Sequence, residues 1–129
     1  KKLIKSHNLE KNIKLPGFKK NIYPYLTKSD LLISTSYFEG FPNVVIEALS
    51  CGIPVISSKS HGGIYEILKN QTYGDLFENG NEKDLENKII NFFNNPKKLL
   101  KKSLKGQNDL SRFSEKNSAK KYEKIFLNL

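Results

Sequence analysis

Short apolar runs alternate along this chain with longer segments in which apolar residues recur at helical spacing. Two compact runs, residues 31–35 and 55–57, are flanked by turn residues, which is typical of strands buried on both faces of a parallel sheet. The segment Asn43–Ser50 between them has helical character, with Asn43 as its expected N-cap and Gly52 as its stop. This order predicts a βαβ unit.

The same alternation continues on both sides of that unit. Further strands are expected at 13–15 and 74–77. Further helices are expected at 1–9, 21–29, 64–68 and 82–94. Two more helices should follow, one that begins at Pro96 and one that Ser114 caps. The apolar face expected for the helix at 82–94 consists of Leu85, Ile89, Ile90 and Phe93, and that of the last helix of Ala119, Tyr122, Ile125 and Phe126. Strands that alternate with helices predict an α/β fold on a parallel sheet.

The composition is that of a globular domain. The chain has 129 residues, 37% of them hydrophobic and 27% charged, which excludes collagen-like, disulfide-scaffold and membrane-spanning classes. Its single cysteine, Cys51, can form neither an intrachain disulfide nor a multi-cysteine zinc site, and indicates a reducing compartment. Because the chain begins with Lys1 and contains no methionine, we expect it to be a piece of a longer protein.

The net charge of +9 comes from lysine, since Arg112 is the only arginine. Such a charge can attract nucleic acid, anionic membranes or phosphorylated ligands, but the coding bias of an AT-rich genome would also enrich lysine. Nucleic-acid readers favour arginine for contacts to bases, so no nucleic-acid partner is expected. Two interpretations of the lysine-rich helix at 97–105 stay open: a solvated face, and a surface that docks to anionic lipid.

The loop at 36–43 is the candidate site, because ligands of parallel α/β sheets bind beyond the carboxyl ends of the strands. Gly40 permits backbone conformations that other residues avoid, and Pro42 leads into a helix whose free N–H groups suit a phosphate. Glu39 and Glu47 add two carboxylates that can accept hydrogen bonds from sugar and ribose hydroxyls. Together these groups favour a nucleotide-sugar; the alternative is that both are ordinary surface acids.

The amino-acid sequence of this region resembles a known family signature. Residues 36–56, SYFEGFPNVVIEALSCGIPVI, are similar to the signature of the retaining glycosyltransferases of family 4, also called group 1, and Glu39 and Glu47 match its Glu-x7-Glu motif. The resemblance extends to residues 13–18, to Gly62-Gly63 and the residues that follow, and to residues 74–77. Phe113-Ser114 with Tyr122 resembles the closing helix, so the similarity covers essentially the whole chain.

This resemblance implies the C-terminal, donor-binding half of a GT-B enzyme, in which two Rossmann-like domains enclose the active site. Residues 1–129 would be a partial nucleotide-sugar-binding domain, with 112–129 as its closing C-terminal helix. The family's Gly-Arg strand, a nearby lysine and the acceptor domain would precede Lys1. In the family's strand order two missing strands lie between those at 13–15 and 31–35. We therefore expect neither a continuous sheet nor catalysis from this piece alone.

The implied activity is retaining transfer of a hexose from a nucleotide-sugar to an envelope glycan or a lipid-linked acceptor, without cofactor or metal. Catalysis would rest on stabilising the departing diphosphate. Glu39, the catalytic candidate, would bond the hydroxyls of the donor sugar, and Glu47 those of the ribose. The other substrate-binding candidates are Gly40, Phe41, Pro42, Asn43 and Val44 at the sugar and diphosphate, and Gly17 and Phe18 beside the base.

Two other functions and two locations stay open. The chain could belong to a nucleotide-sugar-binding or epimerase-like GT-B protein without transferase activity, or to a basic nucleic-acid binder. The expected location is the cytoplasm, with the inner face of the cytoplasmic membrane as a further option.

Four remaining side chains allow alternatives. His7 and His61 are separated from each other and from Cys51, so no metal site is expected. His61 could approach a substrate or be merely exposed. Glu66 could mark the rim of the cleft or be a surface acid, and Lys59 could meet a phosphate.

Overall fold

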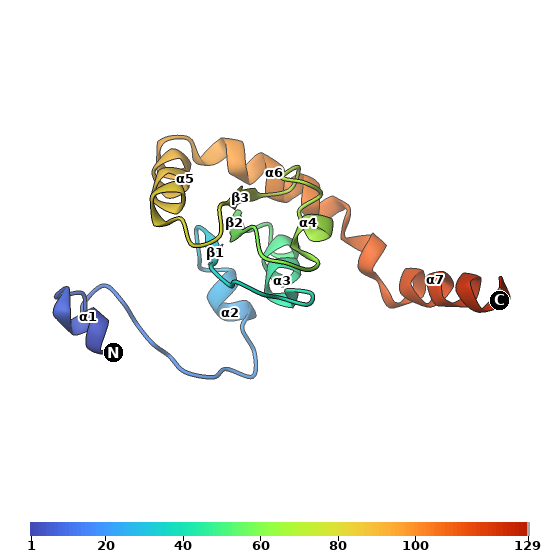
Figure 1. Cartoon of the computed structure of the whole chain (residues 1–129), viewed down its shortest axis with the longest axis horizontal. Helices are drawn as coiled ribbons and strands as arrows, with labels where there is room; N and C mark the ends of the chain where they lie inside the picture. The colour runs from blue at the N-terminus through green and yellow to red at the C-terminus, as the bar shows by residue number, and fades with distance from the viewer. Residues whose placement is uncertain (129) are drawn as a thin grey trace.

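A computed structural model describes residues 1–128 of the chain. Its centre is a parallel sheet with the order β1 (Leu32–Ser34), β2 (Val55–Ser58) and β3 (Asp75–Phe77) (Figure 1). Helix α3 (Asn43–Ser50) connects β1 to β2, and α4 (Ile64–Ile67) connects β2 to β3. The predicted α/β fold and its βαβ unit are therefore confirmed.

Helices cover both faces of this sheet, because neighbouring residues of a strand point to opposite sides. On one face Val55 and Leu76 pack against buried residues of α3 and α4. On the other face Ile56 and Phe77 pack against α5 (Glu82–Asn94) and α6 (Pro96–Asn108). The buried residues of the larger cluster are Leu26, Val45, Ala48, Leu49, Ile53, Val55, Ile64, Ile67, Leu68, Tyr73 and Leu76.

The sheet differs from the prediction at its first edge. All four residues of β2 are buried, but Ile33 of the edge strand β1 is exposed, so burial on both faces holds for β2 and not for β1. Residues 13–15 form no strand. They lie in a connection that runs apart from the sheet (Figure 1), where their backbone has no strand to pair with. The expected interruption therefore lies between residues 13–15 and β1. The strands β1, β2 and β3 themselves form a continuous sheet.

Several predicted helix ends are confirmed. The Asn81 side chain accepts a hydrogen bond from the Asp84 N–H at 2.9 Å and begins α5. Ser114 similarly begins α7 (Glu115–Leu127). Gly52 follows α3 with a φ of +71°. The remaining helices are α1 (Lys2–Ser6), α2 (Tyr23–Leu26) and the 3-10 turn η1 (Leu110–Phe113).

Two predictions about helix detail are wrong. Asn43 is not the cap of α3: Pro42 occupies that position, and Asn43 is the first helical residue. On α5 the residue that fills the core is Phe92, whereas Ile90 and Phe93 are exposed. The reason is that α5 presents the i, i+4, i+7 stripe that starts at Leu85 to the sheet.

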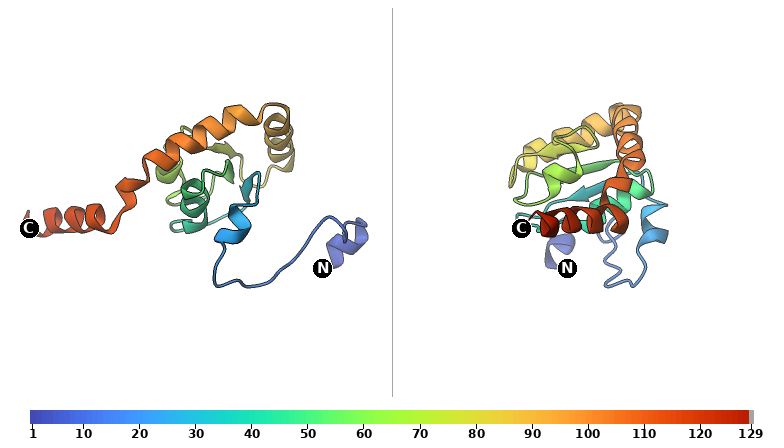
Figure 2. Two further views of the ribbon diagram at one scale, coloured as in Figure 1. Left: turned by 180° about the vertical axis from the view of Figure 1, so that it is seen from behind. Right: turned by 90° about the vertical axis from the view of Figure 1, so that its right-hand side faces the viewer.

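Helix α6 crosses the amino ends of the strands. The Ser103 hydroxyl donates to the carbonyl of Gly52, which lies before β2, at 3.0 Å. Lys102 bonds Asp75, at the start of β3, at 2.5 Å. Helix α7 then extends away from the body, and the two termini lie at opposite ends of the molecule (Figure 2).

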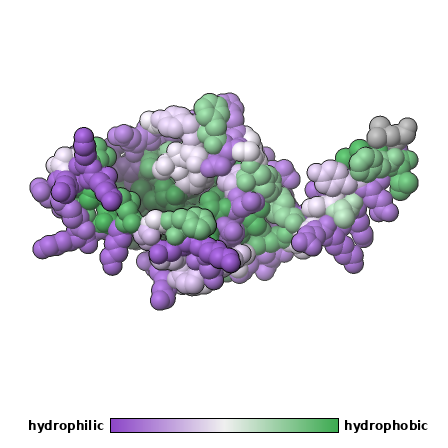
Figure 3. Space-filling view, turned by 90° about the horizontal axis from the view of Figure 1, so that it is seen from below, coloured by the Kyte–Doolittle hydropathy of each residue, from purple (hydrophilic) through white to green (hydrophobic). Residues whose placement is uncertain are grey.

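The apolar side chains of α7 stay largely uncovered within residues 1–128. Tyr122, Ile125 and Phe126 are all exposed, and Figure 3 shows apolar groups along one side of this helix and hydrophilic groups along the other. No helix among residues 1–128 is both long and apolar enough to cross a membrane.

Gly106 provides a test of the packing between α6 and the sheet. Alanine normally stabilises a helix interior by up to about 1 kcal/mol over glycine, but a Cβ at this position would lie 2.9 Å from the Tyr73 Cβ and 3.1 Å from a Leu49 methyl. Overpacking costs about 1–3 kcal/mol. We therefore expect Gly106→Ala to lower the free energy of unfolding by about 1 kcal/mol in urea titrations, with the exposed Lys105→Ala as control. A stabilised Gly106→Ala chain would contradict this packing.

Candidate functional site

The loop at 36–43 follows the carboxyl end of β1 and is held by the loop that follows β2. Phe38 pairs with His61 as an isolated parallel bridge. The Glu39 N–H donates to the His61 carbonyl at 3.2 Å, and the Gly63 N–H donates to the Gly40 carbonyl at 2.9 Å. The backbone on both sides of Glu39 is therefore fixed by residues that are more than twenty positions away in the sequence.

Side chains complete this support. The Ser58 hydroxyl of β2 donates to the Ser36 carbonyl at 2.5 Å, and the Ser36 hydroxyl donates to the Glu39 carboxylate at 2.7 Å. On the other side, the Asn79 amide donates to the Tyr37 carbonyl at 3.2 Å. These bonds orient the half-buried carboxylate of Glu39 at the carboxyl end of the sheet.

Glycines are required at Gly62 and Gly63, in the loop that follows β2, rather than at Gly40. A Cβ at Gly62, where φ is +116°, would lie 1.8 Å from the Glu39 carbonyl oxygen, and a Cβ at Gly63 would lie 2.2 Å from the Phe41 ring. Gly40 itself has an ordinary φ and no neighbouring atom within 4 Å of a Cβ. The close approach that requires glycine therefore occurs at Gly62 and Gly63, and the backbone of Gly40 does not use the freedom that a glycine permits.

Glu47 lies on the face of α3 that points away from the sheet. Val45 and Leu49 are fully buried, and Glu47 is half-buried on the opposite side. Within residues 1–128 its carboxylate forms no hydrogen bond or ion pair. The backbone N–H groups of Asn43 and Val44 likewise donate to no group there. A carboxylate and two amide donors are thus open to a ligand at the start of this helix.

The sole arginine has a structural role that the sequence did not indicate. Arg112 donates to the carbonyls of Glu66 at 2.9 Å and Ile67 at 2.8 Å, at the carboxyl end of α4. Its guanidinium lies 4.2 Å from the centre of the Phe113 ring, and that ring meets Phe41 edge-on at 5.4 Å. Arg112 thereby connects α4 to the candidate loop; its isolation in a lysine-rich chain was the only signal in the sequence.

Gly17 and Phe18 lie apart from this loop in the structure. Gly17 adopts a φ of +69°, which favours glycine, and Phe18 is 93% exposed. Both belong to the connection between α1 and α2 that runs away from the body (Figure 1). Their contact with a base stays a prediction.

The structure shows what the other polar candidates, Lys59 and His61, contact. Lys59 pairs with Glu78, and this hydrogen bond raises the pKa of Lys59. His61 is exposed and stacks on Phe38, with ring centres 5.7 Å apart. Residues 1–128 bring together no group of three metal-ligating side chains. A reaction without a metal stays a prediction.

The lysine-rich helix α6 lies at the other end of the sheet from the loop at 36–43. Its contacts are to Gly52 and Gly74, which precede β2 and β3. The candidate loop instead follows β1. A membrane bound to these lysines would therefore not face Glu39; membrane contact stays a prediction.

The comparisons with known proteins agree with this geometry. Residues 1–109 match the family of glycosyl transferases group 1. The chain belongs to this family. It is 35% identical over 96% of its length to an N-acetylgalactosaminyltransferase of Campylobacter jejuni that is named for a diphospho-undecaprenol-linked substrate. It is 29% identical over 97% of its length to a poly(ribitol-phosphate) alpha-N-acetylglucosaminyltransferase of Staphylococcus aureus.

Solved structures place this glycosyltransferase chain in the GT-B fold. It superimposes on 35% of the chain of Anabaena HepE in complex with UDP, with a TM-score of 0.88, 28% identity and 99% of the present chain covered. HepE has also been crystallised with UDP-glucose. The chain spans 30% of the Campylobacter relative and 26% of the Staphylococcus relative.

The two glycines Gly62 and Gly40 provide a matched test of how the loop is held. We expect Gly62→Ala to lower the free energy of unfolding by about 2–4 kcal/mol or to displace residues 36–43, because its Cβ would overlap the Glu39 carbonyl. Gly40→Ala should change it by less than about 1 kcal/mol, because its surroundings are open. Urea unfolding and amide chemical shifts of the loop measure both effects. Equal effects of the two substitutions would refute this account of the loop.

Proposed function

We propose that this chain is the donor-binding part of a retaining hexosyltransferase that takes a sugar from a UDP-sugar. The observation that carries the proposal is the succession of Glu39 on the loop at 36–43, the N–H groups of Asn43 and Val44, which donate to no group within residues 1–128, and Glu47 on α3. The likeness to HepE, which has been crystallised with UDP and UDP-glucose, supports the choice of nucleotide.

Each group has a task that suits its chemistry. The N–H groups at the start of α3 and the positive end of its dipole would stabilise the charge of the departing diphosphate. Carboxylates are acceptors of hydrogen bonds, so Glu39 would bind hydroxyls of the donor sugar and Glu47 those of the ribose. A hydrogen bond to a charged group is worth about 1.5–3 kcal/mol, which suffices to fix the orientation of the sugar.

The acceptor would be a glycan or a lipid-linked saccharide of the cell envelope, met on the cytoplasmic side of the membrane. The names of the Campylobacter and Staphylococcus relatives support this, since one refers to a diphospho-undecaprenol and the other to poly(ribitol-phosphate). The acceptor domain and the residues that grip the diphosphate would lie outside this chain, which spans about a third of its relatives.

Substitution of the two carboxylates tests the donor site. In the complete enzyme we expect Glu39→Gln and Glu47→Gln to lower kcat/KM by about 10²-fold or more, because each removes a charged acceptor from the reacting donor. Transfer from a radiolabelled UDP-sugar measures the rate. Glu123→Gln, on the exposed face of α7, is the control and should retain the wild-type rate. Donor variants as active as this control would exclude the assignment.

The same assay separates transfer from mere binding. A nucleotide-sugar-binding or epimerase-like protein would bind UDP in calorimetry, yet give no glycosylated product with any acceptor. An epimerase-like protein would also change the sugar of the donor itself.

The isolated chain tests whether further residues are needed. We expect the purified 129-residue chain to give no glycosyl transfer, because the acceptor domain and part of the diphosphate site would be missing. Incubation with UDP-sugars and acceptor lipids, followed by mass spectrometry of the products, checks this. Product formed by the isolated chain would show that the site is complete.

A further inference from the structure

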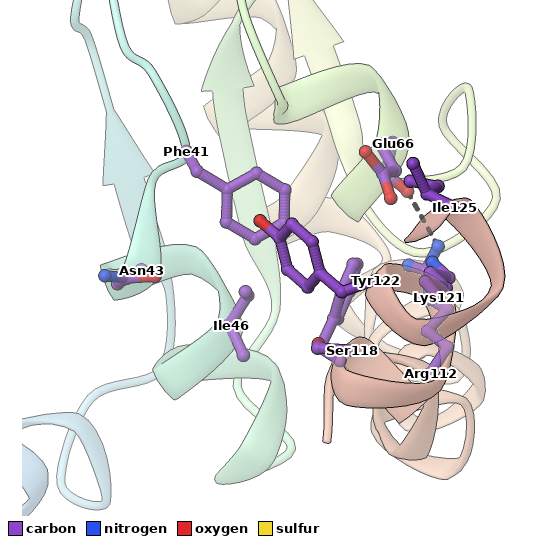
Figure 4. A pocket seen from close by; sticks show the side chains of 10 residues that line it. Phe41, Asn43, Ile46, Glu66, Arg112, Ser118, Lys121, Tyr122 and Ile125 are labelled. Atoms are coloured by element: carbon purple, nitrogen blue, oxygen red, sulfur yellow. Dashed lines mark hydrogen bonds between the residues drawn. The ribbon is translucent and has the colours of Figure 1, made fainter. Parts of the chain in front are cut away.

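A recess lies beside the candidate donor loop. It has a volume of about 570 Å³ and is bounded by the start of α3, by α4 and by the inner side of α7 (Figure 4). Phe41 and Asn43, which border the recess, belong to the donor loop and to the first residue of α3. A molecule in this recess would therefore lie next to a bound donor, with these two residues at the boundary between the two sites.

The lining combines aromatic surface with unused polar groups. Phe41 and Tyr122 contribute rings from opposite walls (Figure 4). Asn43, Glu66 and Ser118 add an amide, a carboxylate and a hydroxyl. Within residues 1–128 none of these polar side chains, nor the Tyr122 hydroxyl, has a hydrogen-bond partner. Both donors and acceptors are thus available to a ligand.

One wall of the recess is rigid. Arg112 binds the end of α4 through the carbonyls of Glu66 and Ile67. The same side chain lies on Phe113, whose ring meets Phe41. The positions of Glu66 and Phe41 are therefore set by the fold, as expected of a largely preformed site.

We propose that this recess is a subsite for a sugar residue of the acceptor, distinct from the donor site; the inference rests on the proposed function. A pyranose offers apolar C–H faces for the aromatic rings and hydroxyls for the amide, carboxylate and phenol. The volume lies within the usual range of about 300–1,000 Å³ for ligand pockets. The charges of the lining are mixed, because the Glu66 carboxylate and the Lys121 ammonium both border the recess and Arg112 is engaged by backbone carbonyls. A neutral molecule with many hydroxyls fits this lining better than an anion does, since the carboxylate would repel the anion.

The experiment uses the complete enzyme with N,N′-diacetylchitobiose as probe, since the name of the Campylobacter relative gives its acceptor an N-acetylhexosamine. Saturation-transfer NMR with saturating UDP present should show bound chitobiose. Tyr122→Ala should weaken its binding at least about tenfold, equivalent to about 1.4 kcal/mol. Phe126→Ala is the matched control, because Phe126 is an equally exposed aromatic residue of α7 that does not line the recess.

Glu66→Gln provides a second measurement that does not disturb packing, since its side chain has no partner within residues 1–128. It should raise the KM for the acceptor and leave the KM for the donor unchanged. Displacement of chitobiose by UDP, equal losses in Tyr122→Ala and Phe126→Ala, or no binding to the wild-type enzyme would each overturn the subsite. Tyr122-dependent chitobiose binding by an enzyme that does not bind UDP would support the subsite and contradict the proposed function.

Discussion

The close contact between the loops that follow β1 and β2 is the constraint on which the rest of the site depends. Hydrogen bonds join Glu39 to His61 and Gly40 to Gly63, and the missing side chain of Gly62 lets the two backbones approach. Parallel strands bring their carboxyl ends to the same edge, so this contact requires β1 and β2 to be neighbours in register. In that register Ile33 lies opposite Ile56 and Ser34 opposite Ser57.

The two ends of the sheet serve different purposes. At the amino ends, α6 closes the core through Ser103 and Gly106, and its Lys102 pairs with Asp75 at the start of β3. At the carboxyl ends, carboxylates, amide donors and aromatic rings remain open. Arg112 links the two ends of the sheet, because it follows α6 in the sequence and binds α4 beside the candidate loop.

The fold was largely predictable because its signals are local. The boundaries of α3 and α5, the cap at Asn81 and the βαβ unit follow from apolar spacing and turn residues. Errors arose where a partner decides the outcome. Residues 13–15 have strand composition but no strand to pair with. Phe92 rather than Phe93 fills the core because α5 turns the face with Leu85, Ile89 and Phe92 toward the sheet.

The sequence alone determined the family and the identity of the two acidic candidates, because the motif that contains Glu39 and Glu47 is a continuous segment of the chain. It could not determine what holds Glu39. The hydrogen bonds from Ser58 to Ser36 and from Glu39 to His61, the clearance at Gly62 and the contacts of Arg112 with α4 join residues that are distant in the chain. Only the packing of the strands brings them together. The recess between α3, α4 and α7 exists for the same reason.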